Sequence, residues 1–144
     1  MLNYKKIISR LLDQNIYILS NDDKEAIIID PGLGFDLIDR YLKSENLSPI
    51  AVLATHAHID HIASANDCIK NYNIPFYICR GNSIMLDHYD IMKGYMNVDS
   101  EKPEVSHWIE DSDKKLIIGS FEFNVNYNPG HSPGCMSFEI DSLI

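Results

Sequence analysis

Four side chains able to bind a metal ion lie within six consecutive positions of this 144-residue chain, at His56, His58, Asp60 and His61. Histidine is the commonest protein ligand of metals, and zinc favours nitrogen and oxygen donors of this kind. In an extended segment, residues two apart point to the same side, so His56 and His58 can reach one ion. Asp60 and His61 follow as the backbone turns, which suggests a second ion beside the first. A polar loop with surface histidines is the weaker interpretation of so dense a pattern.

The cluster must lie where a strand ends and a helix begins. Residues 50–54 form a short apolar run with the length of a buried strand. Apolar residues then recur near helical spacing, which predicts one helix over residues 61–72. Ligands bind at the carboxyl ends of strands in many α/β sheets, so this is a suitable place for a site.

The rest of the first half alternates strands and helices. We predict strands at 15–20, 25–30 and 75–78, a hairpin turn at 21–23 and a helix at 35–45. Strand–helix–strand–helix–strand order predicts that the central part of the sheet is parallel.

The second half is predicted to be mostly strand. Residues 83–88 suit a short helix, residues 115–118 and 121–127 suit strands, and a last strand begins near residue 136. His88, at the end of this short helix, and His107, after it, are each interpreted as a surface or packing histidine.

Composition limits the class of protein. The length suits one domain over residues 1–144, and the net charge of −9 argues against nucleic-acid and anionic-membrane partners. Cys68, Cys79 and Cys135 show no paired spacing, which indicates reduced thiols, and we interpret them as buried. No apolar run has the length of a membrane span, and the first residues lack a secretion signal. We therefore expect a cytoplasmic protein that acts on a small molecule.

Residues 55–61 resemble the His-x-His-x-Asp-His signature of the metallo-β-lactamase superfamily. That superfamily includes glyoxalase II-like thioester hydrolases, lactonases, lactamases, nucleases and persulfide dioxygenases. Residues 129–134, Pro-Gly-His-Ser-Pro-Gly, are similar to its second metal motif, in a loop that prolines and glycines make rigid. The resemblance implies a four-layer αββα sandwich, and His131 as the ligand that completes a tri-histidine site with His56 and His58.

The resemblance also implies roles for other residues. A tri-histidine zinc site with an open position for water suits hydrolysis. Asp60 either ligates a second metal or deprotonates the attacking water, and His61 ligates the second metal. Asp30 either lies beneath the metal site or forms a turn, and both alternatives stay open. Zinc is the expected cofactor, as one or two ions, with iron and manganese as alternatives.

The chain departs from the superfamily pattern in two ways. Ala63 and Ser64 occupy positions that are usually glycine, and the bridging aspartate and last histidine are absent. Asp141 comes too early to be the bridge. We therefore expect the C-terminal part of the sandwich to be missing, and a homodimer or other partner to cover the exposed sheet edge.

Three functions compete. The first is a glyoxalase II-like metal-dependent hydrolase of a thioester or other small ester-like substrate. The second is a non-catalytic metal-binding fragment that needs a partner half. The third is a mononuclear iron enzyme of the persulfide dioxygenase kind, since two histidines and one carboxylate suit iron. A nuclease is disfavoured by the acidic charge.

Overall fold

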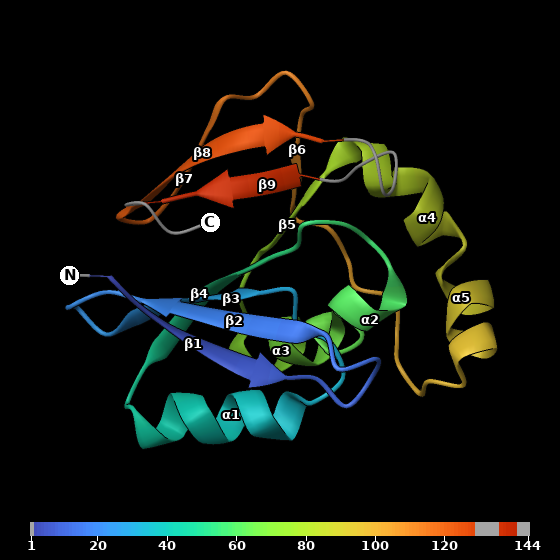
Figure 1. The fold of residues 1–144 in the computed structure, drawn as a ribbon, viewed down its shortest axis with the longest axis horizontal. Coiled ribbons are helices and arrows are strands. Elements are labelled where there is room, and N and C mark those ends of the chain that lie inside the picture. Colours follow the sequence, from blue (N-terminus) through green and yellow to red (C-terminus); the bar gives the residue numbers. More distant parts are fainter. Residues whose placement is uncertain (1, 129–135, 141–144) are drawn as a thin grey trace.

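Two β-sheets form the centre of the molecule. The structure is a computed structural model, and it describes residues 2–128 and 136–140. The first sheet contains, in spatial order, β1 (Asn3–Ile8), β2 (Asn15–Ser20), β3 (Glu25–Ile29), β4 (Ser48–Leu53), β5 (Phe76–Cys79) and β6 (His107–Ile109). The second contains β7 (Lys115–Ile118), β8 (Phe121–Tyr127) and β9 (Met136–Glu139). In Figure 1 the second sheet lies above the first.

Strand directions match the predicted arrangement. β1, β2 and β3 pair antiparallel, whereas β3, β4, β5 and β6 pair parallel. The parallel centre predicted from the alternation of strands and helices is confirmed. Because these strands are parallel, the carboxyl ends of β3, β4 and β5 lie at the same edge of the sheet, where ligands commonly bind.

The helices are α1 (Phe35–Ser44), α2 (Ile59–Ile62), α3 (Ala65–Tyr72), α4 (Ser83–Asp87) and α5 (Tyr89–Met96), with a 3₁₀ turn η1 at Arg80–Asn82. The prediction of one helix over residues 61–72 is wrong. The chain breaks at Ser64, whose N–H donates to the Pro31 carbonyl at 2.8 Å and whose hydroxyl accepts the Gly34 N–H at 3.1 Å. These bonds tie the break to the loop after β3, so α2 and α3 separate there.

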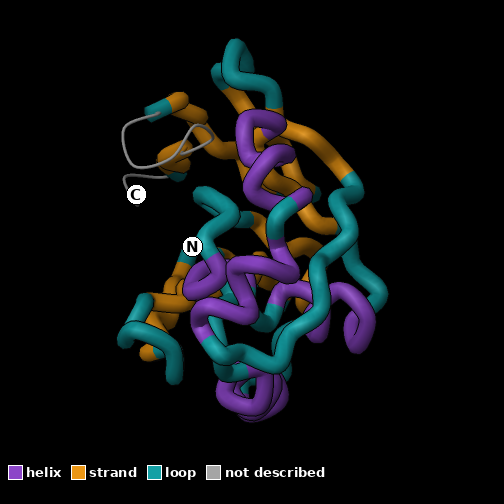
Figure 2. The backbone as a smooth tube through the Cα atoms, turned by 90° about the vertical axis from the view of Figure 1, so that its right-hand side faces the viewer, coloured by secondary structure: helices purple, strands orange, loops and turns teal. Residues whose placement is uncertain are grey.

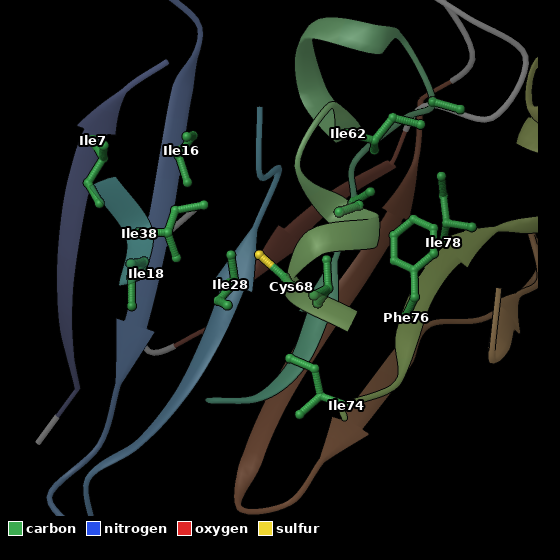
Figure 3. Close-up of a cluster of buried hydrophobic side chains, with 14 of the residues drawn as sticks. Ile7, Ile16, Ile18, Ile28, Ile38, Ile62, Cys68, Ile74, Phe76 and Ile78 are labelled. Carbon is green, nitrogen blue, oxygen red and sulfur yellow. The ribbon is translucent and has the colours of Figure 1, made fainter. Parts of the chain in front are cut away.

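Apolar side chains pack on both faces of the first sheet. Ile18, Ile28 and Val52 belong to the cluster that faces the helices, part of which Figure 3 shows. The alternate residues Leu19, Ile27 and Leu53 belong to the cluster between the two sheets. Adjacent strand residues point to opposite faces, so each central strand contributes to both cores.

These packing faces define three successive layers: helices, first sheet and second sheet. In Figure 1, α1 and α3 lie on the side of the first sheet away from β7–β9. Figure 2 gives the view turned by 90°, with α1 end-on beneath the strands. The predicted fold class is confirmed for the layers that the described residues contain. Among the helices of residues 2–128 and 136–140, none has the length and apolar character that a membrane span requires.

Two of the three cysteines lie within the described part. Cys68 and Cys79 are buried and free, as predicted, while Cys135 lies outside the described residues. Burial raises the pKa of both described thiols, so these cysteines are inert packing residues and not nucleophiles.

Candidate metal site

The loop from the end of β4 to α2 gathers three imidazole rings. The ring centroids of His56 and His58 lie 4.7 Å apart, and those of His56 and His61 lie 3.9 Å apart. His56 is buried, and His58 is the extended residue before α2. Asp60 and His61 are on the first turn of that helix. The strand-to-helix transition predicted from the sequence therefore exists and brings the donors together.

A buried carboxylate, that of Asp30, holds this loop. Asp30 follows β3, the parallel neighbour of β4, and is only 5% exposed. Its Oδ1 accepts the Thr55 N–H at 2.7 Å, and its Oδ2 accepts the Thr55 hydroxyl at 2.7 Å. The same Oδ2 lies 2.9 Å from Nδ1 of His61. One side chain thus fixes both the start of the loop and a ring on the helix that follows.

These contacts assign the protons of two rings. The Thr55 hydroxyl has a single proton, which it donates to Asp30, so its 3.0 Å contact with His56 requires the Nδ1–H of His56 to be the donor. His61 likewise donates its Nδ1–H to Asp30. Both neutral rings then carry the lone pair on Nε2. Metal-binding histidines are usually oriented in this way, through a hydrogen bond from the nitrogen that does not bind the ion.

The charge around His61 is negative. Desolvation lowers the pKa of His61, but the hydrogen bond to Asp30 and the charges of Asp30 and Asp60 raise it, and the net shift is upward. The Asp60 Oδ2 lies 3.5 Å from the His61 Nε2. A positive ion is favoured in such surroundings by the same electrostatics that favour the protonated ring.

The structure places some predicted donors but not all. His131, the predicted third ligand, and Asp141 lie outside the described residues. Within residues 2–128 and 136–140, no group of three His, Cys, Asp or Glu side chains is arranged so that it could hold a metal ion. In the described residues, the His58 and His61 rings each lie close to the His56 ring, and the Asp60 carboxylate lies close to the His61 ring. Their chemistry, imidazole nitrogens with one carboxylate, fits zinc, iron or manganese.

Two positions near the loop escaped prediction from the sequence. The Thr55 hydroxyl bridges Asp30 and His56, as described above. The Asn82 side chain accepts the N–H of Ala57, the residue between His56 and His58, at 2.9 Å. A usable signal existed for Asn82, since it follows the strand next to β4, and parallel strands deliver their carboxyl ends to one edge.

Gly32 lies against the candidate site with no room for a side chain. A Cβ at this position would lie 2.5 Å from the Asp60 carbonyl oxygen and 2.8 Å from the Ser9 hydroxyl, and would also collide with Gln14. We expect Gly32→Ala to lower the free energy of unfolding by about 1–3 kcal/mol, because the backbone of Asp60 must shift. Chemical denaturation measures this change.

Gly94 provides the control for that substitution. It lies in α5 and a Cβ there meets nothing within 4 Å. Gly94→Ala should therefore stabilise the protein by about 0.5–1 kcal/mol, as alanine favours helix. Equal stability of Gly32→Ala and wild type would contradict the close approach at Gly32.

Comparisons with known proteins point to one family. The pattern of the metallo-beta-lactamase superfamily matches residues 9–144. A probable metallo-hydrolase, YqgX of Bacillus subtilis, is 33% identical over 90% of this chain and 61% of its own length. A hydroxyacylglutathione hydrolase of Buchnera aphidicola is 43% identical over 95% of this chain and 47% of its own.

A solved structure gives the same result. The BLEG-1 B3 metallo-beta-lactamase matches with a TM-score of 0.85 and 36% identity, over 96% of this chain and 67% of that one. The chain spans about three fifths of the length of the first curated relatives that it matches.

Proposed function

Because the chain belongs to the metallo-β-lactamase superfamily, we propose that it binds metal ions at the loop between β4 and α2 and hydrolyses a thioester or other small ester-like substrate. Members of this superfamily include metallo-hydrolases. The relative named a hydroxyacylglutathione hydrolase, which shares 43% identity with this chain, supports a thioester as substrate.

One observation carries the proposal. The His58 and His61 rings both lie against the His56 ring, beside a buried carboxylate that anchors the loop and holds the His61 ring. A histidine cluster kept only for packing would not need two rings with their Nδ1 protons fixed and the lone pair therefore on Nε2, the form in which imidazole binds a metal.

Each residue has a proposed role. His56 and His58 would hold one ion with His131, and Asp60 with His61 would hold a second. When bound, zinc would supply a water with a pKa of about 7 and a positive charge for the substrate carbonyl. In its alternative role, Asp60 orients the attacking water and accepts its proton. Asp30 and Thr55 keep the Nδ1 protons on His61 and His56, so that the rings cannot rotate away or change tautomer.

Metal binding should be measurable on the purified chain. We expect elemental analysis to find one or two ions per chain, and zinc at about 100 times its dissociation constant to stabilise the metal-free protein by about 2.7 kcal/mol. Calorimetry or chemical denaturation with and without zinc gives this value. A synthetic thioester tests hydrolysis in the same samples.

A matched pair of variants distinguishes zinc binding at the candidate site from adventitious binding to other histidines. His58→Ala should lose the stabilisation by zinc, whereas His88→Ala should keep it, because His88 lies on the exposed turn between α4 and α5 and its Nδ1 is 2.8 Å from the Ile84 carbonyl. If wild type takes up no zinc, iron or manganese, the proposed function is wrong.

A second candidate function is a metal-binding module without hydrolytic activity of its own. One observation favours it: a cavity of about 610 Å³ opens between β2 and β9, with Asp30 and Thr55 in its lining, and offers a partner segment access to the candidate metal loop. One or two bound ions with no turnover of the thioester would support this second function over the first.

A further inference from the structure

Asn82 holds the backbone of the candidate metal loop from the side opposite Asp30. It ends η1, directly after β5, and its side chain is fully buried. Its Oδ1 accepts the Ala57 N–H at 2.9 Å, and its Nδ2 donates to the Cys79 carbonyl at 3.1 Å. Both ends of the amide are therefore used, which fixes its orientation and its position.

Ala57 itself has no side chain that could be anchored. It is fully buried, so water cannot replace the bond from its N–H. The peptide groups on its two sides carry His56 and His58, and any rotation of this backbone moves the origins of both rings. A buried hydrogen bond to this one N–H thus controls the relative placement of two imidazoles.

We propose that Asn82 is a positioning residue for metal binding, acting through the Ala57 N–H on the His56–His58 pair. This inference rests on the proposed function. Asp30 and Asn82 hold alternate amides of the loop, those of Thr55 and Ala57, and they come from the strands on either side of β4. The loop that carries the first two donors is thereby clamped from both neighbouring strands.

The test compares two side chains of similar size. Asn82→Leu removes the acceptor, while Asn82→Asp keeps an oxygen for the Ala57 N–H and replaces the amide donor to the Cys79 carbonyl by a carboxyl oxygen. We expect Asn82→Leu to weaken Zn²⁺ binding about 10–100-fold and to alter the visible absorption of bound Co²⁺. Asn82→Asp should retain most of the affinity. Titration against a chelator of known affinity measures both.

A readout in the metal-free protein reports the clamp directly. In Asn82→Leu the Ala57 amide should exchange with deuterium faster, while the Thr55 amide, which Asp30 still holds, keeps its wild-type protection. A general loosening of the fold would accelerate both amides. Tyr72→Phe serves as the control, because it removes a 2.6 Å bond to Asp39 away from the loop and should leave Zn²⁺ affinity unchanged.

The outcomes are separable. Faster exchange at Ala57 with unchanged Zn²⁺ affinity and Co²⁺ absorption would overturn the inference, as would equal losses of affinity in Asn82→Leu and Asn82→Asp. Absence of Zn²⁺ and Co²⁺ binding by wild type would instead overturn the proposed function. If Asn82→Leu does not fold, Asn82→Ser, whose short hydroxyl cannot reach both partners, replaces it under the same expectations.

Discussion

Asp30→Ala is expected to destabilise the metal-free protein by about 3 kcal/mol or more and to weaken zinc binding about 100-fold. The stability loss follows from three donors, the Thr55 N–H, the Thr55 hydroxyl and the His61 Nδ1–H, that lose their acceptor. Each partly buried donor left without an acceptor costs about 1–3 kcal/mol. The backbone adds to the loss, since Asp30 has φ of 51°, a conformation that aspartate tolerates better than alanine.

The affinity loss has a separate cause and needs a separate variant. Asp30→Asn keeps the shape and the tolerated backbone conformation but removes the charge. In the place of Oδ1 its NH₂ would face the Thr55 N–H and release the start of the loop. In the place of Oδ2 it would face the Thr55 hydroxyl and the His61 Nδ1, so the ring protons would no longer be fixed. Removing a hydrogen-bond partner of a metal-binding histidine costs about 10–100-fold in affinity, and we expect Asp30→Asn in that range.

Denaturation of the metal-free variants and zinc competition test the two effects independently. Asp39→Asn is the control, since this carboxylate accepts the Tyr72 hydroxyl at 2.6 Å between α1 and α3, far from the loop in sequence and contacts. Zinc affinity in Asp30→Asn equal to that of wild type would contradict the role of Asp30 in holding the loop and, directly or through Thr55, in fixing the protons of His61 and His56.

The sequence predicts the elements whose apolar pattern is regular. β2, β3, α1, β7 and β8 were located within a residue or two, because each alternates or repeats at the period of its structure. The sequence does not predict β1, because all of its residues except Ile7 are exposed, as is common for an edge strand. The sequence does not predict α5, because the exposed apolar residues Ile91 and Tyr95 obscure the helical spacing of Tyr89, Met92 and Met96, which pack on the core.

The same rule separates the features of the candidate site that the sequence predicts from those that it does not. Spacing alone predicts that His56 and His58 share a side, since that depends on local backbone geometry. The contact between Asp30 and Thr55 depends on the pairing of Ile29 with Leu53, a register between strands that no local pattern encodes. The two interpretations of Asp30 do not exclude each other. Its carbonyl accepts the Gly32 N–H at 2.8 Å in a turn, while its carboxylate holds the loop.

Asp60→Asn is expected to lower kcat for thioester hydrolysis about 10²–10⁴-fold, the usual contribution of a general base. Asparagine preserves the size of the side chain and an oxygen acceptor but cannot take a proton at neutral pH. Packing should be little affected, because Asp60 is only partly buried and its backbone, held against Gly32, is unchanged.

The number of ions bound by Asp60→Asn decides between its two proposed roles. If Asp60 is chiefly a ligand, the stoichiometry falls from two ions to one and added metal restores part of the rate. If it is chiefly the base, the stoichiometry is unchanged and no metal concentration restores kcat. A wild-type kcat in Asp60→Asn would exclude both, and the proton of the attacking water would then have to leave through a group outside the cluster around His56.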